Sequence, residues 1–180
     1  FFYQHKLKIF VCGFCIILGI LTGIFTAIKM NANDATELFE SFNITNSISD
    51  IEKFNENFFG RMFSYTIVTL LLFAFSQSSI LNIFSYCLIT YRAFLISINC
   101  VMLIIVYSFG GILKSIIIIF PCQLIMLCLL CLYFCFAYSK TCERKKYKNL
   151  RTKDYFYPII ITIVALSVVN LVETLLLFVF

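Results

Sequence analysis

Five long stretches without a charged residue dominate this 180-residue chain, and they cover residues 9–28, 62–91, 93–113, 115–139 and 155–172. A helix of ~20 mostly apolar residues spans the hydrocarbon core of a bilayer, so each stretch reaches or nearly reaches that length. The composition agrees, since 62% of the residues are hydrophobic and 13% are charged. These features exclude a soluble globular domain and a disordered chain, and they predict a polytopic membrane protein.

The apolar stretches lack the alternation of barrel strands, and lipid offers their backbone groups no hydrogen-bond partners, so we expect helices. We predict an all-α fold, a polytopic transmembrane helix bundle that forms a single membrane domain over residues 1–180. The first stretch has full spanning length and is followed by Lys29, so we interpret it as a retained helix, although no Met precedes Phe1 and we expect a short N-terminal stretch to be missing. The predicted spans cover about 9–28, 60–76, 92–109, 112–138 and 155–177.

Charge predicts the orientation of these spans. The loop at 30–59 carries six acids and one Lys, whereas the segment 139–154 carries seven bases and two acids. Because Lys and Arg are enriched on the cytoplasmic side, the first segment is expected outside and the second inside. Five spans satisfy both expectations when the N-terminus is cytoplasmic and the C-terminus lies outside, with an outer turn at Gly110-Gly111. The basic segment is interpreted as a topological anchor or as a docking site for acidic lipid or a cytoplasmic partner.

The stretch 62–91 is too long for one ordinary helix and too short for two helices with a turn. Polar residues at 76–79 and Asn82 interrupt it, and such groups are costly against lipid. We predict a short re-entrant or interfacial helix at 79–91. The alternative is one long tilted helix.

The outer loop carries two pairs with the spacing of a helix N-terminal capping box, followed by apolar residues at helical spacing. They predict two short amphipathic helices on the outer membrane surface. This surface would either cover the spans or dock an extracytoplasmic partner. The candidate docking residues are Asp34, Glu37, Leu38, Phe42, Ile51 and Phe54.

Gly19 and Gly23 form a small-xxx-small pair in the first span, which lets a second helix approach closely. That helix could belong to the same chain or to a second copy in a homo-oligomer. Pro121 is predicted near the middle of the fourth span, where it removes a backbone donor, with Gln123 two residues on. A helix broken in this way is tolerated inside a bundle or beside water.

Glu173 is the one acid inside an apolar run, and Asn170 lies one turn away on the same helical face. An intramembrane carboxylate costs about 2.5 to 3.5 kcal/mol on insertion scales, so it is expected to face the bundle, a cavity or a partner. A buried Glu173 would be protonated or hydrogen-bonded to groups such as Asn170, Gln123 or Lys114. The alternative is an exposed position at the outer interface.

The residues that intramembrane catalysis would need are not in place. His5 is the only His, no Asp lies inside a span, and no zinc motif such as H-E-x-x-H is present. Nine cysteines include C-x-x-C pairs at Cys12 and Cys15 and at Cys128 and Cys131, which inside apolar helices are typical of small hydrophobic side chains. A thiol peptidase that pairs His5 with Cys87 or Cys142 is a minor alternative. We therefore expect a non-enzyme without metal, cofactor or nucleic acid.

Several short motifs, in this order along the chain, resemble those of the stage II sporulation protein M family. They are Gly19-Ile20-Leu21-Thr22-Gly23 within Phe10 to Ile28, Asn55-Glu56-Asn57-Phe58-Phe59, Gly110-Gly111, Phe120-Pro121-Cys122-Gln123 and Asn170-Leu171-Val172-Glu173. The resemblance covers about residues 6–176. Family members often carry Pro-His-Gly or Pro-Gln-Asn where this chain has Pro121-Cys122-Gln123. A role that depends on the His of the family motif therefore cannot be transferred to this chain.

This resemblance implies a non-catalytic scaffold in a bacterial cytoplasmic membrane that anchors and localises peptidoglycan hydrolases during forespore engulfment. Relatives encoded with circular bacteriocins imply an alternative, in which the chain assists maturation, export or immunity beside an ATP-driven exporter. The export path would run past Pro121, Gln123 and Glu173. An assembly factor for an unrelated membrane complex is a third hypothesis.

Overall fold

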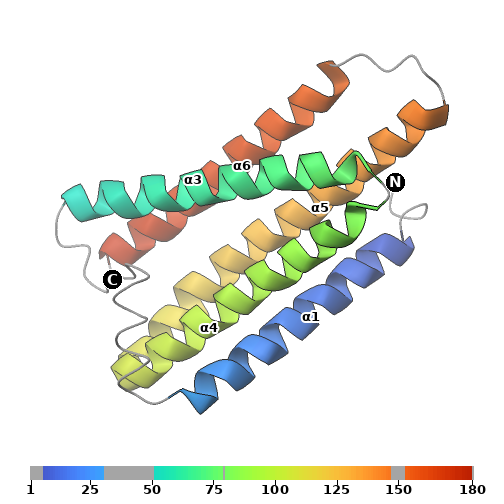
Figure 1. Cartoon of the computed structure of the whole chain (residues 1–180). Helices are drawn as coiled ribbons and strands as arrows, with labels where there is room; N and C mark the ends of the chain where they lie inside the picture. The colour runs from blue at the N-terminus through green and yellow to red at the C-terminus, as the bar shows by residue number, and fades with distance from the viewer. Residues whose placement is uncertain (1–5, 31–50, 79, 147–152, 180) are drawn as a thin grey trace.

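The computed structural model of the chain describes residues 6–30, 51–78, 80–146 and 153–179. Its elements are α1 (Lys6–Lys29), α3 (Ile51–Ser76), α4 (Asn82–Lys114), the π-helix η1 (Ser115–Ile119), α5 (Phe120–Lys146) and α6 (Lys153–Val179) (Figure 1). Five helical stretches are long and apolar enough to cross a membrane: Lys6–Lys29, Phe58–Ser76, Asn82–Ile105, Phe109–Cys142 and Tyr157–Phe178. The predicted all-α polytopic bundle is confirmed.

The spans alternate in direction through the bundle. In Figure 1 the first residues of α1, α4 and α6 lie at the same end as the last residues of α3 and α5. Helices α4 and α5 contact each other, α1 packs on the far side of α4, and α3 and α6 cross the other side (Figure 1). The start of α1, the end of α5 and the start of α6 therefore share one end of the molecule.

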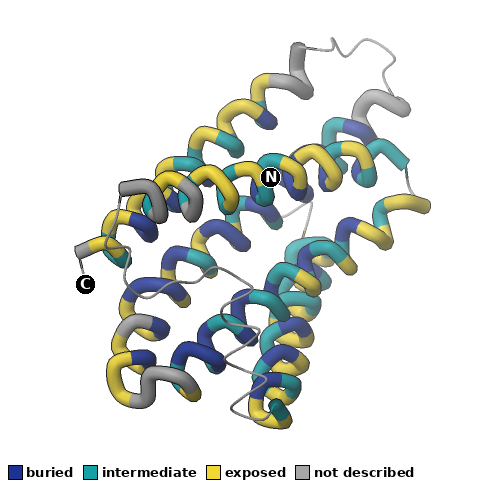
Figure 2. The backbone as a smooth tube through the Cα atoms, turned by 60° about the vertical axis from the view of Figure 1, so that its left-hand side comes forward, coloured by how far each residue is buried: buried dark blue, intermediate teal, exposed yellow. Residues whose placement is uncertain are grey.

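Helix α1 packs closely along α4. Its buried residues Cys12, Gly19, Gly23 and Ala27 recur at spacings of seven and four residues and form one stripe, and Figure 2 shows buried positions alternating with exposed ones along the helices. A Cβ atom at Gly19 would lie 2.7 Å from the Ala93 Cβ, and one at Gly23 would lie 2.6 Å from the Phe94 carbonyl oxygen. The two glycines thus pack within the chain, which is the intramolecular alternative of the sequence interpretation.

The separate short helix expected at 79–91 is not formed, and neither is a single helix through 62–91. Helix α3 ends at Ser76, and α4 begins at Asn82 and continues without interruption past residue 92. The reason is that one buried face runs through both parts of α4. Ser85, Ile89, Ala93, Ile96 and Cys100 recur on it at spacings of three and four residues.

The chain reverses direction close to the expected Gly110-Gly111 turn. The Ser115 hydroxyl donates a hydrogen bond to the Cys100 carbonyl oxygen over 3.1 Å, and Gly111 lies against the Leu103 carbonyl group. The absence of a side chain at Gly111 makes this close approach possible.

Pro121 lies inside the apolar helical span Phe109–Cys142, as expected, but the helix is not broken at this residue. It is the second residue of α5, and the π-helix η1 directly precedes it. A proline lacks the N–H of an α-helical hydrogen bond and clashes with the preceding turn, and here these effects fall beside a π-helical stretch. Such single π-helical turns occur inside α-helices. The sequence indicated an irregular helix near Pro121 but not its π form.

The helix of the second span begins earlier than the predicted end of the loop at residue 59. Helix α3 begins at Ile51 and runs directly into the second span, so residues 51–59 do not form a separate surface helix. Phe54 stacks on Phe58 with ring centroids 6.4 Å apart and meets Phe178 of α6 edge-on at 6.1 Å. These ring contacts continue the packing face of α3, which explains why the helix does not break there.

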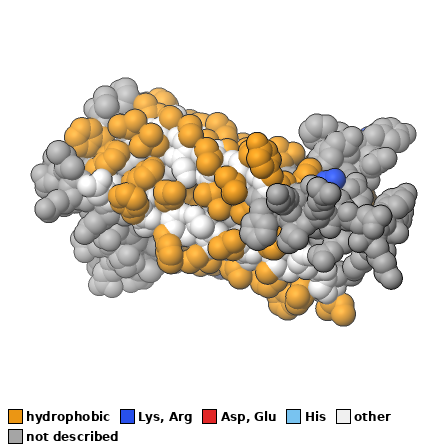
Figure 3. Space-filling model, turned by 90° about the horizontal axis from the view of Figure 1, so that it is seen from above, with side chains coloured by type: hydrophobic (Ala, Val, Ile, Leu, Met, Phe, Trp, Pro, Cys, Tyr) orange, Lys and Arg blue, Asp and Glu red, His pale blue; other side chains and the backbone are white. Residues whose placement is uncertain are grey.

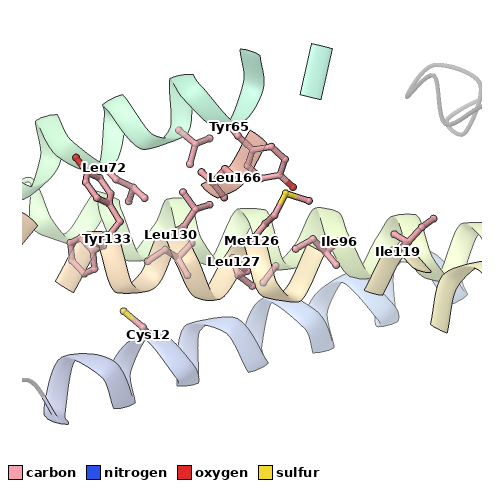
Figure 4. Packing of buried hydrophobic residues seen from close by; sticks show 14 of the residues in the cluster. Cys12, Tyr65, Leu72, Ile96, Ile119, Met126, Leu127, Leu130, Tyr133 and Leu166 are labelled. Carbon is pink, nitrogen blue, oxygen red and sulfur yellow. The ribbon is translucent and has the colours of Figure 1, made fainter. Parts of the chain in front are cut away.

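Hydrophobic side chains cover the outside of the bundle as well as its interior. Figure 3 shows them over the middle of one face, and Leu21, Phe25, Ile67 and Val164 are among the exposed ones. Such an exterior is typical of helices that contact lipid. Inside, Leu72, Met126 and Leu130 pack between the helices (Figure 4).

Substitution of Gly23 by Leu should separate α1 from α4, because the new side chain meets the Phe94 carbonyl oxygen. We expect the free energy of unfolding to fall by about 1 to 3 kcal/mol, as for other overpacked sites. The measurement is unfolding of purified protein by titration of a denaturing detergent. Gly13→Leu is the matched control, since nothing lies within 4 Å of a Cβ atom there; equal losses in both variants would contradict the packing.

Candidate functional site: an intramembrane polar network

The Glu173 carboxylate lies inside the bundle and joins three helices. Its side chain on α6 has no exposed surface. Arg61 of α3 donates from Nη1 to Glu173 Oε1 over 2.6 Å. Gln123 of α5 donates from Nε2 to both carboxylate oxygens, at 2.9 and 2.7 Å. Glu173 is therefore buried inside the bundle and is not exposed at the outer interface.

Gln123 extends this contact toward the centre of the bundle. Its side-chain oxygen accepts a hydrogen bond from the Tyr65 hydroxyl of α3, while its nitrogen is used by Glu173. The Glu173 carboxylate only accepts hydrogen bonds and the Tyr65 hydroxyl donates one. The NH2 group of Gln123 must therefore face Glu173, and its oxygen must face Tyr65. The Tyr65 ring packs beside Leu166 of α6 and Met126 of α5 (Figure 4).

Arg92 of α4 completes the network on the far side of Tyr65. Its guanidinium group lies 4.9 Å from the centroid of the Tyr65 ring, and its Nη2 atom donates to the Ser64 carbonyl oxygen at 3.1 Å and to the Ser64 hydroxyl at 2.6 Å. Contact with an aromatic face stabilises a guanidinium group, more so when water is excluded. We call these six residues the intramembrane network: Arg61, Ser64, Tyr65, Arg92, Gln123 and Glu173.

Asn170 lies next to the network but bonds elsewhere. It is fully buried, and its Nδ2 atom donates to the Phe58 carbonyl oxygen of α3 over 3.1 Å. Its Oδ1 atom has no hydrogen-bond partner among the described residues. Asn170 thus provides a second polar link between α3 and α6.

Burial makes the Arg61 and Glu173 pair sensitive to the loss of either partner. The side chains are 22% and 0% exposed. Two charges in a low-dielectric interior attract strongly, but each also loses its hydration. Such a pair adds little over well-packed apolar residues, whereas an unpaired buried charge is strongly destabilising. The network therefore fixes the way α3, α5 and α6 meet.

The structure brings together two of the residues selected from the sequence, Gln123 and Glu173. Asn170 lies on the same face of α6 as Glu173 but bonds to Phe58. Pro121 is exposed and makes no described contact with the network. The side chain of Lys114, the third expected partner of Glu173, lies outside the described residues.

Sequence reasoning missed Arg61, Ser64, Tyr65 and Arg92. The two arginines served only as the limits of the uncharged stretch 62–91. A usable signal was present, because an acid inside a span is usually paired with a base inside another span. Arg61 lies three residues inside the apolar helix Phe58–Ser76, and that position makes it a candidate partner for Glu173.

Most of the predicted docking surface lies outside the described residues. This holds for Asp34, Glu37, Leu38 and Phe42, and for the side chain of Ile51. Phe54 is described, and it packs on Phe58 and Phe178 as given above.

The cysteines are free thiols. The Cys12 thiol of α1 contacts the thiols of Cys131 and Cys135 of α5, so members of the two C-x-x-C pairs meet in the hydrophobic core. Within the described residues, no group of three His, Cys, Asp or Glu side chains could hold a metal ion.

Comparison with known proteins adds no relative: no family model, no curated protein and no solved structure matches this chain. The fold itself defines the class, a polytopic helical membrane protein with five helices able to span a bilayer.

Replacement of Arg61 by Leu should strongly destabilise the bundle, because it leaves a buried carboxylate with only Gln123 as partner. We expect a loss of about 3 to 5 kcal/mol, the range for one broken buried pair. The measurement is again unfolding in a denaturing detergent. The double variant Arg61→Leu with Glu173→Leu is the control and should recover most of the loss. A double variant at least as unstable as Arg61→Leu would contradict the pairing.

Proposed function

We propose that this chain is a non-catalytic membrane scaffold that anchors a peptidoglycan-degrading complex at the outer face of a bacterial cytoplasmic membrane. The resemblance to the stage II sporulation protein M family suggests the process, forespore engulfment. One observation carries the proposal: the carboxylate of Glu173 is engaged by Arg61 and Gln123. Side chains bound to one another in this way hold helices together rather than wait for a substrate.

The position of the network supports a role in presenting the outer loop. Arg61 lies ten residues after Ile51, where α3 begins, so the ion pair holds the first turns of α3 against α6. Phe54 and Phe178 reinforce the same end by their edge-on contact. The point at which the chain enters α3 is thereby fixed relative to the rest of the bundle, as the anchor of a docking loop requires.

The orientation proposed for the scaffold has its N-terminus in the cytoplasm and its C-terminus outside. Lys6 and Lys8 begin α1, and Lys140 lies near the end of α5. The start of α1 and the end of α5 lie at the same end of the bundle (Figure 1), and the Lys8 ammonium group lies over the Tyr138 ring. Basic residues favour the cytoplasmic side, which puts the acidic loop outside, where the hydrolases act.

Replacement of residues 31–50 by a neutral linker of equal length tests the scaffold. This range leaves α3 intact, because α3 begins at Ile51. We expect the variant to insert normally and to lose the peptidoglycan-cleaving activity that is recovered with tagged wild-type protein from membranes of a spore-forming host. The assay measures release of label from purified peptidoglycan by the eluted material.

The matched control replaces residues 147–152 in the same way, since this segment joins α5 to α6 at the opposite end. It should leave the recovered activity unchanged. Undiminished recovery with the 31–50 variant would refute a scaffold that works through the outer loop.

A second candidate function is the export of, or immunity to, a circular bacteriocin or another peptide. The observation that favours it is the continuous chain of polar contacts from Glu173 through Gln123 and Tyr65 to Arg92. Polar groups inside spans often mark the path of a substrate or proton. Pro121, part of the export path expected from the sequence, makes no described contact with this chain.

The substitution Glu173→Gln tests the export function. It keeps the shape of the side chain and removes its charge. An export component should lose peptide export or resistance per inserted molecule, and undiminished export or resistance per inserted molecule would contradict this second function. Insertion is measured in the same membranes, so that a smaller amount of protein is not mistaken for lost transport.

A further inference from the structure

The intramembrane network carries an excess positive charge. Arg61 and Arg92 contribute two cations, and Glu173 is the only acid among the side chains that the structure describes. Glu173 bonds to Arg61 and not to Arg92. Within the described residues, Arg92 hydrogen-bonds only to the neutral Ser64 and faces the neutral ring of Tyr65.

The depth of Arg92 makes this imbalance costly. It is the eleventh residue of the apolar helix Asn82–Ile105, about 15 Å along the helix from Asn82 and about 20 Å before Ile105 at 1.5 Å per residue. The position is therefore close to the middle of a hydrocarbon core about 30 Å thick. Basic side chains near the ends of a span relieve this cost by reaching the interface, but Arg92 starts too far from either end.

The guanidinium group also has hydrogen-bonding capacity left over. It presents five N–H donors in a planar fork that matches a carboxylate. The two bonds to Ser64 both come from Nη2. Arg92 is half-buried, so part of its side chain is open to the outside of the bundle.

We propose that Arg92 is the docking residue for the transmembrane helix of another protein, one that carries a carboxylate near the middle of the membrane. A second copy of this chain does not fit, because Glu173 is the one acid inside an apolar run of the sequence and it is fully buried and already paired. Lipid phosphate does not fit either, because it lies at the interface and Arg92 lies near the bilayer centre. The inference rests on the proposed scaffold function and names a second contact of the scaffold, within the membrane.

The test uses the full chain reconstituted in phosphatidylcholine vesicles and a synthetic leucine-rich transmembrane peptide with one central Asp. Binding is measured by energy transfer between labels on the chain and on the peptide. The comparison peptide carries Asn in place of Asp, and so keeps the shape and most hydrogen bonds without the charge. We expect the Asp peptide to bind about tenfold more tightly, as for an intramembrane polar contact of 1 to 2 kcal/mol.

The preference for Asp should disappear in Arg92→Leu and persist in Arg92→Lys, which keeps the charge. Lys29→Gln is the matched control, since Lys29 is a base at the end of α1, and it should behave as wild type. Equal binding of the Asp and Asn peptides, or an Asp preference that survives Arg92→Leu, would overturn the proposal. So would loss of the preference on addition of phosphatidylglycerol, because the headgroup of an anionic lipid would then be the ligand of Arg92. None of these results affects recovery of hydrolase activity through residues 31–50, so the two proposals fail separately.

Discussion

The bond between Glu173 and Arg61 is the constraint on which the meeting of α3 and α6 depends. A carboxylate without exposed surface is tolerated in this bundle because a guanidinium group and an amide both donate to it. Helix–helix contact in lipid gains little from the hydrophobic effect, since lipid tails are as apolar as the side chains. Polar pairs and close packing must therefore specify which helices meet. Here the glycine stripe of α1 specifies its contact with α4, and the intramembrane network specifies the contacts among α3, α5 and α6.

Much of the fold could be predicted from the sequence, because lipid leaves an uncharged stretch of ~20 residues few alternatives to a helix. The existence of the five spans, the close packing through Gly19 and Gly23, and the special position of Glu173 follow from such local rules. The limits of α3 and α4 did not follow. The short helix expected at 79–91 assumed that the polar residues at 76–79 end one span and leave too little chain for another, whereas α4 uses residues 82–91 as its first turns.

The partners of Glu173 could be predicted only in part. Gln123 was among the candidates, but Arg61 is 112 residues away in the sequence, and only the antiparallel packing of α3 on α6 brings it close. Arg92 shows the same limit. Its neutral partners Ser64 and Tyr65 follow one another on α3, and no local pattern distinguishes them from other core residues. Arg92 carries a positive charge that no acid among the described side chains balances. From this charge we infer an acidic partner helix.

The central claim is that Glu173 is an ionised carboxylate bound to Arg61 inside the bundle. Infrared difference spectroscopy of the reconstituted protein tests it most directly, by subtracting the spectrum of Glu173→Gln from that of the wild type. We predict that the difference contains the stretching bands of an ionised carboxylate and that they are unaffected by replacing water with heavy water. A band of a protonated carboxyl group in their place would show that Glu173 is neutral and would contradict the account.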